Sequence, residues 1–349
     1  MNQLSFIGRD SLIDLKNQLK ERNVRRLFLV RGKGSFVVCG AENAICPIFR
    51  DLRIEVVEFK EFSTNPKMEE VQIGTECFLS SRSDCILAVG GGSVIDMAKL
   101  IRHYAVEKCG RTELFAIPTT AGTGAETTHF AVVYVDGNKQ SIEANDILPD
   151  AAFIYPPFTY NNDAYLTACT GFDALAQAIE AYWNKNATPE SDECALRAIS
   201  YIHLQLPMCV SNSSNELRDD LSVGAYWAGR AINITKTTAP HAFSYAFTSK
   251  CGYPHGHAVA LTFPFFANLN MAGNNKDTLL RESLKIRSHS NLQEYFIKYT
   301  RDIGLSFKGT NGYDLSDLLH EVNTQRLSNN PVIIDNHEIA KLHKYFSLL

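Results

Sequence analysis

Residues 90–99 read GGGSVIDMAK, and this stretch decides the expected fold of the first half of the chain. It follows an apolar run at residues 85–89 and opens into a helical pattern. A second glycine-rich stretch, PTTAGTGAE at residues 118–126, follows another apolar run at residues 114–117. A strand that leads through a glycine turn into a helix is how α/β proteins bring backbone amides to a phosphate. The two stretches together favour a nucleotide site over glycine turns that merely pack.

Strands and helices alternate around these two stretches. The β-rich and helix-periodic runs predict strands at residues 27–30, 54–59, 85–89, 114–117 and 151–155, helices at 66–79 and 93–104, and a hairpin of residues 130–135 and 140–142. This order implies an α/β domain with a parallel sheet and helices on both faces.

Helical patterns dominate after Pro156-Pro157, where we place the domain boundary. The expected domains are an α/β dinucleotide-binding domain, residues 1–156, and an all-α domain that binds metal and substrate, residues 157–349. The active site is expected in the cleft between them, where ligand pockets prefer to lie. The strongest helical patterns cover residues 172–183, 191–202, 217–232, 242–248 and 257–269.

Composition narrows the class of protein. The chain has 349 residues, 45% hydrophobic and 21% charged, with a net charge of −4. These values are typical of a soluble enzyme and give no electrostatic reason to expect nucleic acid or an anionic membrane as a partner. Nine cysteines without a C-x-x-C pair argue for a reducing compartment and against a disulfide framework. No apolar run approaches the ~20 residues of a membrane span, and residues 1–10 do not read as a signal peptide, so a cytoplasmic protein is expected.

Candidate coenzyme contacts come from both glycine-rich stretches. Glycines let a pyrophosphate approach the backbone, where free amides and the helix dipole favour an anion. Small and hydroxyl residues in the second stretch suit the rest of a dinucleotide. The candidates are Gly90, Gly91, Gly92, Ser93, Asp96, Thr119, Thr120 and Thr123, with Lys139 from the expected hairpin.

The end of the strand at residues 27–30 bears on coenzyme choice. In NAD sites an acidic residue there often binds the ribose 2′-hydroxyl. Here the strand is followed by Arg31, Gly32 and Lys33, with no acid and two bases. A 2′-phosphate suits such a position, so NADP(H) is favoured over NAD(H), with Gly32 and Lys33 as contacts. The alternative is that both cations are simply solvated.

A second group of residues suggests a metal. Asp173 and Gln177 are four apart on an expected helix and therefore share one face. His241 and His255 follow downstream beside apolar helices. Separated histidines with an acidic partner upstream are a common catalytic metal site, although a single histidine is more often a packed or surface residue.

Taken together, these motifs resemble the iron-containing (group III) alcohol dehydrogenase family over residues 26–345. The resemblance implies an N-terminal dinucleotide-binding domain, an all-helical C-terminal domain and one divalent metal, Fe²⁺ or Zn²⁺; a homodimer is expected. The same architecture occurs in dehydroquinate synthase-like proteins. The stretches that carry the resemblance are residues 90–96, 118–126, 148–150, 170–175 and 254–256.

The resemblance also assigns roles to single residues. It implies that Asp173, His241 and His255 bind the metal, while Gln177 stands where the family commonly has a fourth ligand, a histidine. A neutral amide oxygen is a poorer ligand for such a metal. A further family histidine position is Tyr245 here, and Gly32 matches the NADP-using members. His257 or Tyr245 would carry protons between the metal-bound oxygen and solvent, unless they are packing residues.

The residues before His241 suggest an anionic substrate. Lys236 lies five residues before His241, a little over one helical turn, with Thr237, Thr238 and the more distant Arg230 nearby in sequence. A cation and hydroxyls suit a phosphonate, phosphate or carboxylate. Together with Gln177 and residues 326–331, this combination of residues most resembles phosphonoacetaldehyde reductases, which form 2-hydroxyethylphosphonate. Lys236 as a solvated helix lysine is the alternative.

Three other functions compete with an aldehyde reductase. A sugar-phosphate cyclase, which is a lyase, would share the glycine turn and the metal ligands, but its usual Ser-x-x-Gly-Gly-Lys loop is AGTGAE at residues 121–126 here. An NAD-dependent polyol or sugar-acid dehydrogenase is the nearest alternative. The third alternative is a non-catalytic protein that only binds nucleotide or partners; its sole support is Gln177 in place of the usual histidine ligand.

Overall fold

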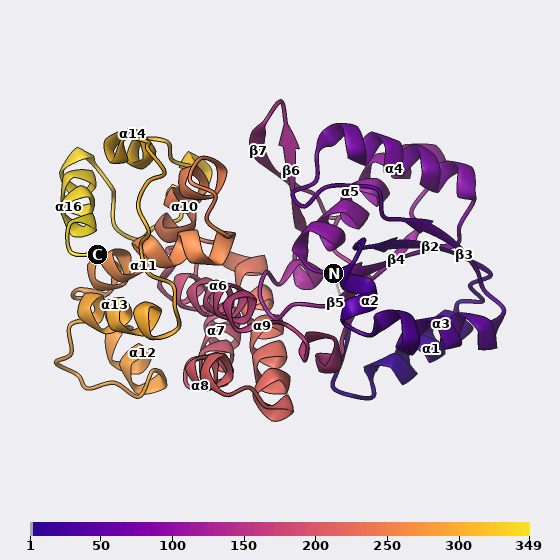
Figure 1. The fold of residues 1–349 in the computed structure, drawn as a ribbon, viewed down its shortest axis with the longest axis horizontal. Helices are drawn as coiled ribbons and strands as arrows, with labels where there is room; N and C mark the ends of the chain where they lie inside the picture. Colours follow the sequence, from indigo (N-terminus) through magenta and orange to yellow (C-terminus); the bar gives the residue numbers. More distant parts are fainter. Residues whose placement is uncertain (1–2) are drawn as a thin grey trace. The chain divides into compact units, whose positions relative to one another are not determined.

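The computed structural model describes residues 3–349. The chain divides into two compact units, Met1–Asn162 and Asp163–Leu349. We expected the boundary at Pro156-Pro157, and the division between the units falls a few residues later. The first unit contains all the strands of the described chain, and the second consists of helices and loops (Figure 1).

A parallel sheet forms the centre of the first unit. All neighbouring strands pair in parallel, which confirms the fold predicted from the glycine-rich stretches. The edge strand at residues 4–7 was not predicted. The six strands lie in the order β1 (Leu4–Ile7), β8 (Ala151–Ile154), β5 (Glu113–Pro118), β4 (Cys85–Gly90), β2 (Arg26–Arg31) and β3 (Glu55–Phe59).

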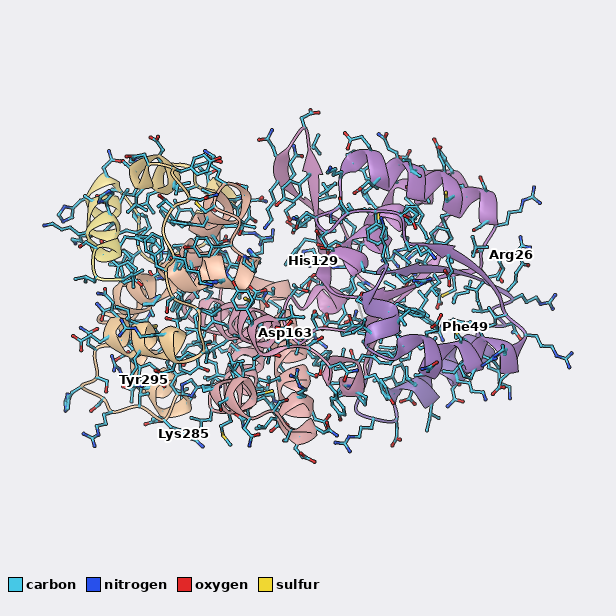
Figure 2. All side chains as sticks on the ribbon, viewed as in Figure 1. Arg26, Phe49, His129, Asp163, Lys285 and Tyr295 are labelled. Carbon is cyan, nitrogen blue, oxygen red and sulfur yellow. The ribbon has the colours of Figure 1, made fainter. Side chains whose placement is uncertain are left out.

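Helices cover both faces of this sheet, as expected. Successive residues of β2 show why: Leu27 and Leu29 pack into one apolar cluster, whereas Phe28 and Val30 pack into another. The first cluster includes Phe49, labelled in Figure 2, and is covered by α1 (Ser11–Glu21), α2 (Ser35–Val38) and α3 (Ala41–Leu52). The second cluster is covered by α4 (Met68–Ser81) and α5 (Gly92–Cys109).

A separate antiparallel hairpin joins the first unit. It consists of β6 (Phe130–Val135) and β7 (Asn138–Glu143), paired from Phe130–Glu143 to Val135–Asn138. Asp136 and Gly137 between them have φ values of 49° and 77°. Two successive positive φ angles are what a two-residue hairpin turn with the correct twist requires, so the predicted hairpin is confirmed. Two short 3₁₀ helices, η1 (Ala125–Thr127) and η2 (Pro156–Thr159), complete the unit.

The second unit is built around α6, in which every residue from 171 to 183 is buried. Asp163, labelled in Figure 2, starts this helix by accepting a hydrogen bond from the Leu166 amide at 2.8 Å. The five helices predicted from the strongest patterns are all present, with ends that differ by up to eight residues. The helices of this unit are α6 (Ala164–Trp183), α7 (Pro189–Ile202), α8 (Gln205–Ser211), α9 (Asn215–Thr235), α10 (Ala239–Ser249), α11 (His255–Met271), α12 (Asp277–Ser283), α13 (Leu292–Asp302), α14 (Leu315–His320), α15 (Thr324–Leu327) and α16 (Asn336–Phe346).

Two expectations from composition can be compared with the structure. None of the helices within residues 3–349 combines the length and apolarity that a membrane span requires. All nine cysteines carry free thiols, as expected from their scattered positions.

Candidate metal centre

Asp173, His241 and His255 converge in the second unit. One ligand atom from each lies within 4.8 Å of the others. The Asp173 Oδ1 atom is 3.1 Å from His241 Nε2 and 3.8 Å from His255 Nε2. Asp173 and His241 are buried, whereas the His255 side chain is 32% exposed. One carboxylate and two imidazoles therefore surround one point, and solvent reaches this site from the side of His255.

The sequence Pro254-His255-Gly256 explains how α11 reaches α6. A Cβ atom at Gly256 would lie 1.9 Å from the carbonyl oxygen of Cys169 and 3.0 Å from the Cβ of Asp173. Only glycine permits this contact, because the obstacle includes backbone that cannot move aside. The close approach places His255, the first residue of α11, against Asp173 on α6.

Glu180 orients His241 from the other side. The Glu180 carboxylate accepts a hydrogen bond from His241 Nδ1, which leaves Nε2 directed at Asp173. Burial by itself would lower the pKa of His241, but the carboxylates of Glu180 and Asp173 outweigh it and raise the pKa to about 9. Glu180 is completely buried.

Two further groups hold the Glu180 carboxylate. Its Oε2 atom accepts from the backbone amide of Thr238 at 2.6 Å and from the Thr238 hydroxyl at 2.8 Å. That hydroxyl in turn accepts from the indole of Trp183 at 2.9 Å. Glu180 was not predicted as a site residue. Its position could have indicated it, because residues 173, 177 and 180 share one face of a helix.

The donor set fits a divalent cation. Asp173 and Glu180 place two buried carboxylates beside His241, and burying such charge is costly unless a cation balances it. A carboxylate oxygen with two imidazole nitrogens is a donor set that both iron and zinc accept. Asp173, His241 and His255 form the metal site.

Gln177 contacts this site through Asp173. Its side-chain amide donates to Asp173 Oδ2 at 3.1 Å, and the side chain is buried. In this position Gln177 steadies the ligand carboxylate. That it also binds the metal, as the fourth-ligand position in the family would imply, stays a prediction.

Gln177→His is expected to tighten metal binding by about tenfold, because imidazole is a stronger donor than an amide oxygen. Gln177→Ala is the matched control and should weaken binding, because Asp173 loses a hydrogen-bond donor. Titration of the metal-free protein with Zn²⁺ against a competing chelator measures both. Equal affinity in all three proteins would show that residue 177 takes no part.

His257 and Tyr245, the two residues expected to carry protons, differ in burial and in their contacts. His257 is fully buried; its Nε2–H donates to the carbonyl of Ser306 at 2.9 Å, and its Nδ1 accepts from the Tyr165 hydroxyl at 2.8 Å. Burial lowers the pKa of His257. Tyr165 is 42% exposed and so links His257 to solvent; the sequence reading missed it. Tyr245 is half-buried on α10, one turn after His241.

The expected continuous helix before His241 is wrong. Helix α9 ends at Thr235, Lys236 has a φ of 64°, and α10 begins at Ala239. The Asn184 side chain binds the carbonyls of Thr235 and Lys236 at 3.1 and 3.2 Å, which stabilises the break. Lys236 is half-buried in this break, so its five-residue separation from His241 does not correspond to a helical turn.

Of the other candidate substrate residues, Thr238 and Arg230 bind other side chains and Thr237 is buried. Thr237 is buried, and its carbonyl accepts from the Asn329 amide at 3.0 Å. The Thr238 hydroxyl, which we considered as a substrate donor, binds Glu180 instead. Arg230 approaches Glu190 on α7 at 3.8 Å and the Tyr226 hydroxyl at 3.2 Å.

The Asn329-Asn330 pair holds the segment that leads to His241. Asn330 accepts from the Ala239 amide at 3.4 Å and exchanges hydrogen bonds of 2.8 and 2.9 Å with Asn270. All these side chains are buried. Residues 326–331, which we read as a substrate-class signature, therefore have a structural use within the second unit.

The coenzyme candidates gather at one edge of the sheet in the first unit. Strands β4 and β5 pair up to Gly90–Pro118, and the Thr119 amide donates to the Gly90 carbonyl at 3.0 Å. A Cβ atom at Gly92 would lie 2.9 Å from the side chain of Thr123, and one at Gly91 would lie 3.4 Å from Thr120 Oγ1. The two loops thus pack against each other where α5 begins.

The strand order adds a second reason to place a coenzyme here. The chain passes from β2 to β3 on one side and then to β4 on the other side of β2. Ligands of open α/β sheets bind at such a reversal, outside the carboxyl ends of the strands. Gly32 follows β2 and Gly90 ends β4, with Arg31 and Val89 in register. These residues fit the pyrophosphate and ribose of a dinucleotide.

Some coenzyme candidates also bind within the protein. Ser93 Oγ accepts from the Asn65 amide at 3.2 Å, and Lys33 lies 3.1 Å from Glu61. Asp96 accepts from the Val132 amide at 3.0 Å, so it connects α5 to the hairpin. Lys139 is half-buried on the other strand of that hairpin.

Lys99 is a buried cation for which the sequence pattern predicted no role. It is fully buried and donates to Thr128 Oγ1 at 3.0 Å and to the Phe130 carbonyl at 2.9 Å. Burial lowers the pKa of Lys99 to about 8, opposed by the charges of Asp96 and Glu126. Burial also raises the pKa of Glu126 to about 7. The two hydrogen bonds of Lys99 tie α5 to the segment that leads from the second glycine-rich stretch into β6.

Comparisons with known proteins agree with this geometry. The family model described as iron-containing alcohol dehydrogenase matches residues 3–156, and the C-terminal model of the same family matches residues 167–292. The chain is 30% identical over 285 residues to the NAD-dependent methanol dehydrogenase of Bacillus methanolicus, covering 76% of this chain and 74% of the relative. It is 30% identical over 288 residues to the 1,3-propanediol dehydrogenase of Citrobacter freundii, covering 78% and 74%.

Solved structures resemble the whole chain. An iron-containing alcohol dehydrogenase from Thermotoga maritima has a TM-score of 0.88 at 27% identity, covering 100% of this chain and 99% of that one. A sulfoacetaldehyde reductase from Bifidobacterium kashiwanohense, in complex with NAD⁺, has a TM-score of 0.89 at 26% identity, covering 99% and 97%. With the metal ligands and glycine-rich loops in place, the chain belongs to the iron-containing alcohol dehydrogenase family and is a metal- and NAD(P)-dependent alcohol oxidoreductase.

Proposed function

We propose that this protein reduces a small anionic aldehyde, such as phosphonoacetaldehyde to 2-hydroxyethylphosphonate, with NADP(H) as the preferred coenzyme. The observation that carries the substrate class is Lys236, a half-buried cation in the break that leads to the metal ligand His241. The likeness to a sulfoacetaldehyde reductase supports it, because that substrate is also a short aldehyde with an anionic group.

The chemistry follows from where each residue lies. When bound, the divalent ion supplies Lewis acidity to the substrate oxygen and NADPH supplies the hydride. Asp173, His241 and His255 hold the ion, and Glu180 keeps His241 Nε2 facing it. His257 or Tyr245 is the proposed proton carrier between the substrate oxygen and solvent, and a 2.8 Å hydrogen bond joins His257 to the exposed hydroxyl of Tyr165.

A reductase assay tests the reaction class. The metal-loaded protein should oxidise NADPH in the presence of phosphonoacetaldehyde faster than with uncharged aldehydes of similar length. The loss of NADPH absorbance over time measures the rate with each aldehyde. Faster turnover of methanol or 1,3-propanediol with NAD⁺ would instead place the protein with the relatives that carry those names.

Gly32→Asp is expected to shift coenzyme preference toward NADH by at least about tenfold, because a carboxylate repels a 2′-phosphate and binds a ribose hydroxyl. A Cβ atom at Gly32 would lie 2.1 Å from the Ser35 hydroxyl oxygen, so the Ser35 side chain has to change its rotamer to make room. Gly34→Asp adds the same charge two residues away, where a Cβ meets nothing within 4 Å, and serves as the control. The ratio of kcat/KM values for NADPH and NADH is the measurement. A wild-type protein that prefers NADH would contradict the coenzyme proposal.

Lys236→Ala is expected to lower kcat/KM for phosphonoacetaldehyde by about ten- to a hundred-fold, the usual loss for a charge-assisted contact. Turnover of propionaldehyde, which has no charge, should be unchanged. Lys250→Ala is the control; that lysine is paired with Glu321 at the end of α10. Equal losses on both aldehydes would mean that Lys236 supports the fold or the coenzyme rather than the anion.

A further inference from the structure

A buried arginine ends β2 directly before Gly32. Arg26, labelled in Figure 2, begins the strand, and Arg31 ends it. The Arg31 side chain is only 8% exposed, and its guanidinium carbon lies 4.9 Å from the centre of the Phe36 ring. One terminal nitrogen donates to the carbonyl of Gly32 at 3.2 Å. The cation is therefore held beside the residue that would face the ribose 2′ position.

Glu58 on the neighbouring strand β3 binds the other end of this guanidinium. The Arg31 Nη2 atom is 2.7 Å from Glu58 Oε2. Glu58 is 39% exposed and also lies 3.7 Å from Lys60. Within residues 3–349, the buried Nε–H of Arg31 has no hydrogen-bond acceptor, so the pairing with Glu58 leaves part of the guanidinium unused. A phosphate is the kind of anion that a guanidinium binds through several N–H groups.

Glu58 and a coenzyme 2′-phosphate thus compete for one cation. An arginine that already neutralises a carboxylate attracts a second anion weakly, and the exposed carboxylate repels that anion. We propose that Glu58 limits selectivity for the 2′-phosphate by holding Arg31, so that the Arg31–Glu58 pair, together with Gly32, sets the coenzyme preference of this enzyme. The inference rests on the proposed use of NADP(H) and names the residue that restrains it.

Adenosine 2′,5′-bisphosphate and 5′-AMP are the probes, because they differ only in the 2′-phosphate. Calorimetry of the metal-loaded protein without coenzyme gives the ratio of Kd for 5′-AMP to Kd for the bisphosphate. Glu58→Gln, which keeps the size of the side chain, should raise this ratio about tenfold. Glu55→Gln is the matched control: it removes a carboxylate of the same strand, but one that pairs with Arg26 at 2.6 Å at the other end of β2 and is 61% exposed, so the ratio should change less than about twofold.

A double variant shows whether the effect passes through Arg31. In the background of Arg31→Gln, the further change Glu58→Gln should alter the ratio less than about twofold. Should Arg31→Gln not fold, Glu58→Asp replaces it; its shorter carboxylate should give a ratio between those of wild type and Glu58→Gln.

The outcomes separate the two proposals. A wild-type ratio below one contradicts NADP(H) preference but leaves the Glu58 test valid, since that test compares variants. An unchanged ratio in Glu58→Gln, or an equal rise in Glu55→Gln, overturns the role of Glu58 whatever the wild type prefers.

Discussion

His255→Ala should lose nearly all turnover, with kcat/KM reduced by at least ~10³-fold, and should lose most of its bound metal. His255 provides one of the three ligand atoms that lie within 4.8 Å of one another. Polarisation of the substrate oxygen by a metal contributes several kcal/mol to catalysis, and two remaining ligands hold the ion poorly. The fold should survive, because the side chain is 32% exposed and alanine suits the first turn of α11.

Metal content after dialysis, steady-state kinetics and a thermal melt measure this prediction. His320→Ala is the control, because that histidine is exposed on α14 and its side chain bonds the carbonyl of Ser316 in the same helix. The metal assignment fails if His255→Ala retains full turnover after chelation and dialysis.

Glu180→Gln should weaken metal binding by about ten- to a hundred-fold, the usual cost of removing the carboxylate behind a metal-binding histidine. The Glu180 carboxylate accepts from His241 Nδ1 and twice from Thr238. A glutamine has one acceptor oxygen, so either His241 or Thr238 loses its partner. It also removes the negative charge that holds His241 with Nε2 toward the metal.

Thr238 separates this positioning role from a purely structural one. Thr238→Ser keeps the hydroxyl and should bind Zn²⁺ like the wild type, whereas Thr238→Val removes it and should fall between wild type and Glu180→Gln. Competition with a chelator gives the affinities, and a melt of the metal-free proteins gives their stabilities. A lower melting temperature for Glu180→Gln with unchanged metal affinity would reduce Glu180 to a structural residue.

The coenzyme region was the most predictable part of the molecule. Its signals are local: an apolar run, a glycine turn and a helix follow one another at residues 85–99, and the same pattern begins again at residue 114. Parallel strands place their carboxyl ends at one edge, so two such loops meet even though they are far apart in sequence. Residue type and spacing sufficed for this arrangement because strand, glycine turn and helix are encoded by consecutive residues.

The metal ligands were predictable for a related reason. Asp173 sits on a helix whose period is visible, and His255 lies between a proline and a glycine that allow α11 to approach α6. Their convergence depended on the family resemblance rather than on spacing, because no local rule brings position 255 to position 173.

Only the folded chain decided which partners the charged side chains choose. Glu180 is 61 residues from His241, and Arg31 is 27 residues from Glu58, so neither pairing leaves a periodic trace in the sequence. The break at Lys236 depends on Asn184, which comes from the end of a different helix. Patterns along a chain record which residues share a face of one element, whereas the pairing of buried charges is settled by how separate elements pack.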